Sequence, residues 1–248
     1  MTKNSAKLVK SLYLKKFRKE TGLFLVEGEK SIVELAHSDF EVVYLYVTEE
    51  IQNKHYKILS KYSEVTELAT QEELTKAGTL EFNDTGIAVV KQKENVPFEI
   101  GDRELIVALD ELRDPGNLGT IIRTCDWYGV KKIICSETTA EFYNPKVIAS
   151  SMGSFTRTQI FYTDLKTFFA ENKNVPVLGT LLLGQDAHTF AYPQSGILLM
   201  GSESNGINKE LIKSITNKIT IPAYGKAESL NVSMATGIVL DNWRRSLK

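Results

Sequence analysis

From residue 104 onward, short apolar runs alternate with stretches of helical pattern, and no other feature of the chain constrains its fold as strongly. The runs are ELIVALDEL, KKIICSE, VPVLGTLLL, GILLMGSE and KITIPA. Helical patterns occupy residues 117–128, 145–152, 164–171 and 209–214. Apolar strands separated by helices are typical of a parallel sheet covered by helices on both faces. We therefore predict an α/β domain at residues 104–248.

A second, smaller pattern of the same kind precedes it. FLVEG and EVVYLYV are predicted strands on either side of a helical stripe, and GIAVVKQ is a predicted closing strand. QNKHYKILSKY and TQEELTKAG are helix candidates between them. We predict a small α/β domain at residues 1–94 and a linker containing Pro and Gly at residues 95–103.

Composition narrows the class of protein. The 248 residues are 42% hydrophobic and 25% charged, with a formal net charge of −1, which is ordinary for a globular protein. The two cysteines, Cys125 and Cys135, stand in apolar runs, and no CxxC or HExxH spacing occurs. We therefore expect core cysteines and neither a metal site nor a disulfide framework. No apolar run reaches the length of a membrane span and the N-terminus lacks a secretory signal, so we expect a cytoplasmic protein.

The basic residues are unevenly distributed. The first nineteen residues contain seven basic side chains and no acidic one. Such an arm on a nearly neutral protein can contact nucleic-acid phosphates. On charge alone, a solvated helix face is the favoured interpretation.

Three polar segments follow predicted strands of the larger domain. ELRDPGNLGTIIRT follows LIVALD, SESNG follows ILLMG, and YGKAESLN follows ITIPA. Ligands of parallel sheets bind beyond the carboxyl ends of the strands, so we expect these glycine-containing segments to meet at one edge. Neither GxGxxG nor GxxxxGK[ST] occurs, which argues against a P-loop and a nicotinamide-dependent oxidoreductase.

In the first segment, Asn117 follows a Pro-Gly turn and is a candidate N-cap of the next helix. Arg123 stands six residues later among apolar side chains. An arginine there is costly unless it is paired or faces a polar site. Taken alone, Arg123 is better interpreted as a side chain that reaches solvent or a carboxylate.

The other two segments allow similar alternatives. Gly201 would let a ligand approach the backbone closely, although an exposed strand-to-helix turn explains it equally well. Such a turn does not require Glu203. Ser229 or Asn231 can cap the last helix, whereas Ser233 within it suggests close packing.

Together the three segments resemble the motifs of the SpoU/TrmH family of RNA ribose methyltransferases. NLGTIIRTCDWYGV is similar to the Asn-x-Gly…Arg motif, GSESNG to Gly-x-Glu-x-x-Gly, and IPAYGKAESLNVSMA to Ile-Pro…Gly…Ser-Leu-Asn-Val-Ser…Ala. This resemblance covers residues 104–248. LKKFRKETGLFLVEGEKSIVE resembles the accessory RNA-binding domain that is common in the family.

The resemblance implies an α/β fold with a deep C-terminal trefoil knot whose loops bind S-adenosylmethionine. The implied cofactor contacts are Thr180, Leu181, Met200, Gly201, Ile221, Ser229 and Leu230. It also implies a homodimer with its active site near the subunit interface. The last helix, with Ser233, Ala235 and Gly237, would then lie at the dimer surface.

The implied reaction is methyl transfer from S-adenosylmethionine to a ribose 2′-hydroxyl of RNA. The residues that match the family's functional positions are Asn117, Arg123, Glu203, Ser229 and Asn231. The family mechanism uses Arg123 as the base. Because a guanidinium keeps its proton in proteins, stabilisation of the developing oxyanion is an equally physical role, with a substrate phosphate as proton acceptor.

RNA contacts are expected from Lys15, Lys16, Arg18, Lys19, Lys146 and Arg157. Ala149 stands where many family members have an arginine, which puts RNA affinity or target choice in doubt. We favour 23S ribosomal RNA as substrate because the accessory domain is commoner on enzymes that act on large-subunit RNA. A tRNA substrate and a non-catalytic RNA-binding assembly factor are the alternatives.

Overall fold

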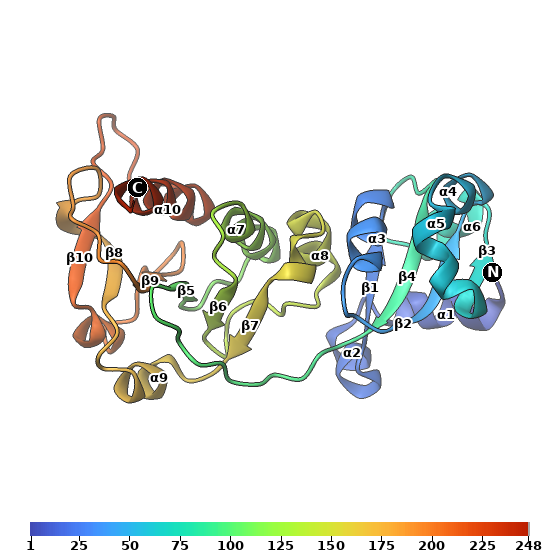
Figure 1. The fold of residues 1–248 in the computed structure, drawn as a ribbon, viewed down its shortest axis with the longest axis horizontal. Coiled ribbons are helices and arrows are strands. Elements are labelled where there is room, and N and C mark those ends of the chain that lie inside the picture. The colour runs from blue at the N-terminus through green and yellow to red at the C-terminus, as the bar shows by residue number, and fades with distance from the viewer. Residues whose placement is uncertain (248) are drawn as a thin grey trace. The chain divides into compact units, whose positions relative to one another are not determined.

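The computed structural model describes residues 1–247, which divide into two compact units (Figure 1). The first unit contains residues 1–94 and 141–156, and the second contains residues 95–140 and those from Arg157 onward. Residues 141–156 are predicted from the sequence to belong to the second domain, whereas their contacts group them with the first unit. Within residues 1–247, no helix is both long and apolar enough to cross a membrane.

A four-stranded sheet of order β1-β4-β2-β3 forms the centre of the first unit. Strands β1 (Leu23–Glu27) and β2 (Val42–Val47) pair antiparallel with β4 (Gly86–Lys91), and β3 (Thr66–Leu68) pairs parallel with β2. The helices are α1 (Lys3–Ser11), α2 (Lys15–Thr21), α3 (Glu29–Ala36), α4 (Glu49–Lys54), α5 (Tyr56–Leu59) and α6 (Gln71–Ala77), with a 3-10 helix, η1, at Ser60–Val65. Strand β3 is not among the predicted strands and is only 3 residues long.

Helix α8 (Pro145–Ser151) packs against β1, which explains why its segment belongs to the first unit. Tyr143 and Phe155, on either side of this helix, carry the aromatic contacts. Their ring centroids lie 4.6 Å and 6.1 Å from the ring of Phe24 on β1. Phe155 also lies 5.7 Å from Phe40. These rings bury apolar surface against the sheet, so the segment is part of this core.

Arg18 on α2 is buried in the same unit, with only 1% of its surface exposed. Its guanidinium donates to Glu141 from Nε (3.0 Å) and Nη2 (2.6 Å), and from Nη1 to the carbonyl oxygens of Leu12 and Tyr13, both at 2.8 Å. These bonds occupy its donors inside the protein. The prediction that Arg18 contacts RNA is therefore wrong for this structure.

Replacing Arg18 by alanine leaves the Glu141 carboxylate without its partner in a largely desolvated site. We expect Arg18→Ala to lower the free energy of unfolding by about 3 kcal/mol, and Arg18→Lys to restore little because lysine cannot bind a carboxylate bidentately. Chemical denaturation measures both. Lys16→Ala is the matched control, since Lys16 is exposed and lies 3.9 Å from Glu20. Equal stability of the Arg18→Ala and Lys16→Ala variants would contradict this assignment.

The second unit contains a six-stranded sheet of order β10-β8-β9-β5-β6-β7, and all its pairs are parallel. The strands are β5 (Leu105–Leu109), β6 (Lys132–Cys135), β7 (Gln159–Tyr162), β8 (Val177–Asp186), β9 (Gly196–Met200) and β10 (Asn217–Thr220). The parallel α/β architecture predicted from the sequence is confirmed. The sequence analysis does not predict β7, which has 4 residues.

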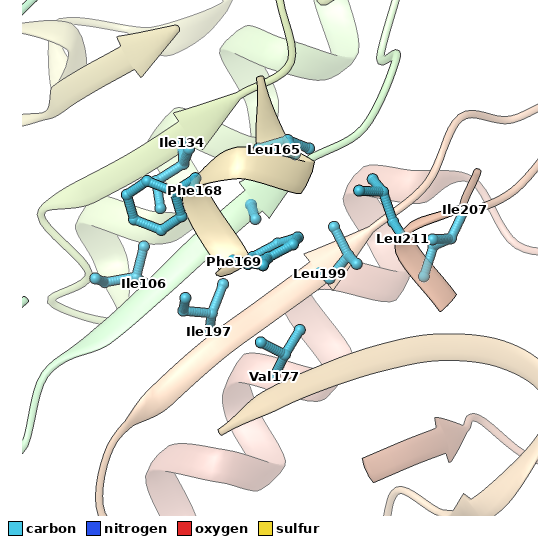
Figure 2. Close-up of a cluster of buried hydrophobic side chains, with 11 residues drawn as sticks. Ile106, Ile134, Leu165, Phe168, Phe169, Val177, Ile197, Leu199, Ile207 and Leu211 are labelled. Carbon is cyan, nitrogen blue, oxygen red and sulfur yellow. The ribbon is translucent and has the colours of Figure 1, made fainter. Parts of the chain in front are cut away.

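Helices cover both faces of this sheet (Figure 1). They are α7 (Pro115–Trp127), α9 (Leu165–Glu171) and α10 (Val232–Ser246), with a 3-10 helix, η3, at Leu211–Ser214. Another 3-10 helix, η2 (Ser154–Arg157), spans the point in the chain where the first unit ends. Helix α7 packs against α10, and α9 packs against η3. Figure 2 shows Phe168 and Phe169 of α9 in one cluster with Ile106, Ile197 and Leu199 of the sheet.

Two further features of this unit bear on the site. The pairing of β5 with β9 brings Leu109 opposite Met200, so the segments that follow these strands begin at the same edge. Cys125 and Cys135 are free and buried, as predicted, and burial raises the pKa of both thiols. They are core residues and not reactive groups.

Candidate active site

Helix α7 begins at Pro115, and its N-cap is Asp114. The side chain of Asp114 accepts a hydrogen bond of 2.7 Å from the backbone N–H of Asn117. The prediction that Asn117 caps the helix is therefore wrong. Proline fits the first helical position and a carboxylate satisfies the exposed N–H groups, so Asp114 is the better cap. The Asn117 side chain is consequently available for contacts outside its own helix.

Asn117 joins all three polar segments through its side-chain amide. Its Nδ2 donates to Oε1 of Glu203, and its Oδ1 accepts from Nδ2 of Asn231 and Oγ of Ser233, both at 3.0 Å. Glu203 lies 86 residues away in the chain and Asn231 lies 114 residues away. The three segments therefore meet at one edge of the sheet, as their positions after β5, β9 and β10 predict.

Asn231 is the N-cap of α10, which decides between the two predicted candidates. Its Oδ1 accepts from the backbone N–H groups of Ser233 (3.0 Å) and Met234 (3.4 Å). Ser229 is exposed in the segment before the helix and makes no hydrogen bond within residues 1–247. The geometry thus gives Asn231 two roles, in the helix cap and in the network around Asn117.

The loop that carries Glu203 is held by its own backbone. Ser202 and Gly206 exchange two backbone hydrogen bonds of 3.0 Å and 2.9 Å. A Cβ atom at Gly201 would lie 2.1 Å from the carbonyl carbon of Gly206. The absence of a side chain at Gly201 is therefore required by the loop itself, and close approach of a ligand is not needed to explain it.

Asp110, directly after β5, anchors the far end of the same loop. It is 3% exposed and its Oδ2 accepts a 2.7 Å hydrogen bond from the backbone N–H of Asn208. Burial raises the pKa of this carboxyl. Asp110 is not among the predicted site residues, although an acidic residue at the end of a fully apolar strand is the signal that indicates it.

The predicted cofactor residues come from neighbouring strands. Thr180 and Leu181 belong to β8, Met200 ends β9, and Ile221 follows β10. Leu230 is 51% exposed. The backbone N–H and C=O groups of Ile221 and Leu230 make no hydrogen bond in the described part of the chain. This edge therefore offers apolar side chains and unpaired backbone groups, which fit a planar nucleoside.

Arg123 faces an open groove of about 700 Å³ between α7 and α10. Its side chain is exposed and makes no ion pair within residues 1–247, so Glu203 binds Asn117 and not Arg123. Ser233 and Met234 also line this groove. Trp127 is 84% exposed and Met234 63% exposed, an unusual exposure for large apolar side chains.

The predicted RNA-contact residues fall into two groups. Lys15, Lys16 and Lys19 are exposed on α2, and Lys146 is exposed in the first turn of α8. Arg157 instead donates from Nε and Nη2 to the carboxylate of Asp126, at 2.7 to 3.1 Å, and is 44% exposed. Lys15, Lys16 and Lys19 therefore present charge to solvent, whereas the charge of Arg157 is largely balanced.

The steric requirement at Gly201 gives a testable expectation. We expect Gly201→Ala to lower the free energy of unfolding by about 2 kcal/mol, because the added methyl group overlaps the loop backbone. Gly225→Ala is the control, since a Cβ there meets nothing within 4 Å and the change should stay within about 0.5 kcal/mol. Urea denaturation of both variants checks this, and equal stabilities would exclude the steric explanation.

Two family models match the chain. The SpoU rRNA Methylase family matches residues 104–241, and the MRM3-like substrate binding domain matches residues 3–82. The first match contains all three polar segments and ends within α10. The second covers most of the small sheet with its basic arm.

Individual relatives extend these matches over the whole chain. The 23S rRNA (guanosine(2553)-2'-O)-methyltransferase of Bacillus subtilis is 30% identical over 95% of this chain and 94% of that protein. An AdoMet-bound rRNA methyltransferase from Sinorhizobium meliloti superposes with a TM-score of 0.90 at 29% identity, covering 100% of this chain and 97% of the other. The tRNA (guanosine(18)-2'-O)-methyltransferase of Aquifex aeolicus is 32% identical over 58% of this chain and 70% of that enzyme.

Proposed function

The chain belongs to the SpoU rRNA methylase family, and from this premise we propose that it transfers a methyl group from S-adenosylmethionine to a ribose 2′-hydroxyl of 23S ribosomal RNA. The observation that carries the proposal is the network in which Asn117 holds Glu203 and Asn231 together. These three residues come from the three motifs of the family. Ser233, which is hydrogen-bonded to Asn117 and Asn231, lines the groove that Arg123 faces, and this supports a catalytic role over a purely RNA-binding one.

Arg123 is the residue we assign to the reacting hydroxyl. S-adenosylmethionine supplies an activated methyl group on a sulfonium with a good leaving group. The 2′-hydroxyl is a poor nucleophile, so the protein has to align it and stabilise the alkoxide that develops. A guanidinium remains protonated and its paired donors match a phosphate. Arg123 therefore stabilises negative charge on the ribose and binds the adjacent phosphate, which accepts the proton.

The remaining site residues position these groups. Asn117 fixes one oxygen of the Glu203 carboxylate, which leaves the other oxygen for the substrate side of the loop. Asn231 is held by the first turn of α10 and in turn holds Asn117. Ser229 lies two residues before Asn231 in an exposed segment, where it can reach a bound ribose.

For the cofactor, we assign the edge formed by β8, β9 and the segment after β10. Thr180, Leu181 and Met200 provide one wall, and Ile221 and Leu230 provide apolar side chains with unpaired backbone groups. Gly201 and Ser229 complete the residues proposed to contact it. The trefoil knot implied by the resemblance stays a prediction, as do the domain boundaries at residues 94 and 104.

A second copy of the chain is proposed to cover the groove between α7 and α10. Trp127 and Met234 expose apolar surface there, and Arg123 opens into the same groove. Exposed apolar surface beside a functional residue is typical of an interface. The dimer would thereby exclude water from the site. We place this assembly in the cytoplasm, where ribosomal RNA is available.

Two observations favour ribosomal RNA over tRNA as the substrate. The rRNA enzyme of Bacillus subtilis aligns along 94% of its length, including the small N-terminal unit. The tRNA enzyme of Aquifex aeolicus aligns with only 149 residues. The N-terminal unit, with exposed Lys15, Lys16 and Lys19, is thus the part that would select a large RNA.

The role of Arg123 is tested by substitution. We expect Arg123→Ala to reduce the rate of methyl transfer by at least about 100-fold, the scale observed when one oxyanion-stabilising donor is removed. S-adenosylmethionine affinity, measured by calorimetry, should remain unchanged. Arg113→Ala is the control, because Arg113 is equally cationic and 73% exposed, and its ion pair within residues 1–247 is with Glu111. Loss of cofactor affinity together with unfolding would show that Arg123 is structural.

The basic arm is tested through the salt dependence of RNA binding. Replacing Lys15, Lys16 and Lys19 by alanine should weaken binding and flatten the slope of log K against log salt by up to about 3, because each phosphate contact releases roughly one counterion. A variant with Lys30, Lys57 and Lys76 replaced removes the same charge from exposed positions elsewhere in the unit. An identical slope in both triple variants would refute phosphate contact by the arm.

A further inference from the structure

The hydroxyl of Ser233 differs from the other helical hydroxyls of α10 in its partners. Thr236 and Ser246 donate to carbonyl oxygens of their own helix, at 2.7 Å and 2.8 Å. This is the usual way for a hydroxyl in a helix to be satisfied. Ser233 is 6% exposed, and its Oγ lies 3.0 Å from Oδ1 of Asn117 and 2.6 Å from Oδ1 of Asn231. Its hydroxyl is therefore directed at the site network.

Each donor of this network points toward the Glu203 carboxylate, beginning with the backbone N–H groups at the start of α10. Backbone N–H groups at the start of α10 require an acceptor, so Asn231 must present Oδ1 to them. Its Nδ2 then faces Oδ1 of Asn117, and Nδ2 of Asn117 faces Glu203. Each amide has only one orientation that satisfies both of its neighbours. Rotation of the Asn117 amide would set donor against donor at Asn231 and acceptor against acceptor at Glu203.

Ser233 stands at the junction of the two amides. Its single proton is shared between the two carbonyl oxygens, both of which accept in the orientation just described. In that orientation Oδ1 of Asn117 has two donors, Nδ2 of Asn231 and the Ser233 hydroxyl, so the hydroxyl adds to its stability. The Ser233 side chain is only 6% exposed, which strengthens this preference.

We propose that Ser233 is a positioning residue for the methyl transfer reaction. It acts through Asn117 and Asn231 to hold the Glu203 carboxylate in its reactive orientation. The proposal rests on the proposed function, and it changes the interpretation of Ser233 from a packing residue of the last helix to a member of the site. Ser233 needs no contact with substrate or cofactor to act in this way.

The direct test is Ser233→Ala, which removes the hydroxyl with little change in volume. We expect kcat for methyl transfer to fall about tenfold, the effect of one buried hydrogen bond, while KM for RNA and the Kd for S-adenosylmethionine change less than twofold. Ser246→Ala is the matched control, because its hydroxyl bonds only to its own helix, and it should keep the wild-type kcat. Wild-type kcat in folded Ser233→Ala overturns the proposal.

A double-mutant cycle separates positioning from a general structural effect. In an Asn117→Ala background, Ser233→Ala should change kcat less than twofold, because the group through which it acts is already absent. An undiminished tenfold effect there would show that Ser233 acts independently of Asn117.

Asn231→Asp provides a second route should Ser233→Ala fail to fold. Aspartate caps a helix as well as asparagine but cannot donate to Asn117. We expect an unchanged melting temperature and a kcat reduced by at least tenfold, and wild-type kcat would again overturn the proposal. Failure of the proposed function would be distinguishable, because the wild-type protein itself would then transfer no methyl group to RNA.

Discussion

The exposed N–H groups at the starts of α7 and α10 require acceptors, and the site depends on which side chains supply them. Asp114 caps α7 and Asn231 caps α10. Because Asp114 caps α7, the Asn117 side chain is not needed as a cap and binds both Glu203 and Asn231.

The sheet brings the segments that carry this network close together. Parallel pairing places Leu109 of β5 opposite Met200 of β9, so the segments with Asn117 and Glu203 leave the same edge. The loop after β9 is then fixed by Asp110, which holds Asn208, and by the lack of a side chain at Gly201. Rigid elements of this kind hold catalytic groups within the narrow limits that a displacement reaction requires.

Much of this arrangement is predictable from the sequence, because strand periodicity and glycine-containing loops are local signals. The parallel sheet and the meeting of three polar segments follow from them. The sequence also indicates Asp114 and not Asn117 as the N-cap, because proline is common at the position directly after an N-cap. The sequence does not show that the backbone of Gly206 excludes a side chain at Gly201, because only the folded loop brings the two residues near each other.

Other features depend on contacts between residues that are distant in sequence. Arg18 has the same charge as its lysine neighbours, and only the folded unit shows that Glu141 neutralises it, 123 residues away. The aromatic contacts that place residues 141–156 with the first sheet are equally invisible to periodicity. Charge counts therefore overestimate the RNA-binding surface, because they do not distinguish buried from exposed cations.

The most direct test of the central claim is the chemical position of the transferred methyl group. Labelled S-adenosylmethionine is incubated with the protein and with 23S ribosomal RNA or tRNA in parallel, and the products are hydrolysed in alkali. A methylated 2′-hydroxyl cannot attack the neighbouring phosphate, so the account predicts label in alkali-resistant dinucleotides of 23S RNA. Label in mononucleotides, which indicates base methylation, or no transfer to either RNA would contradict it.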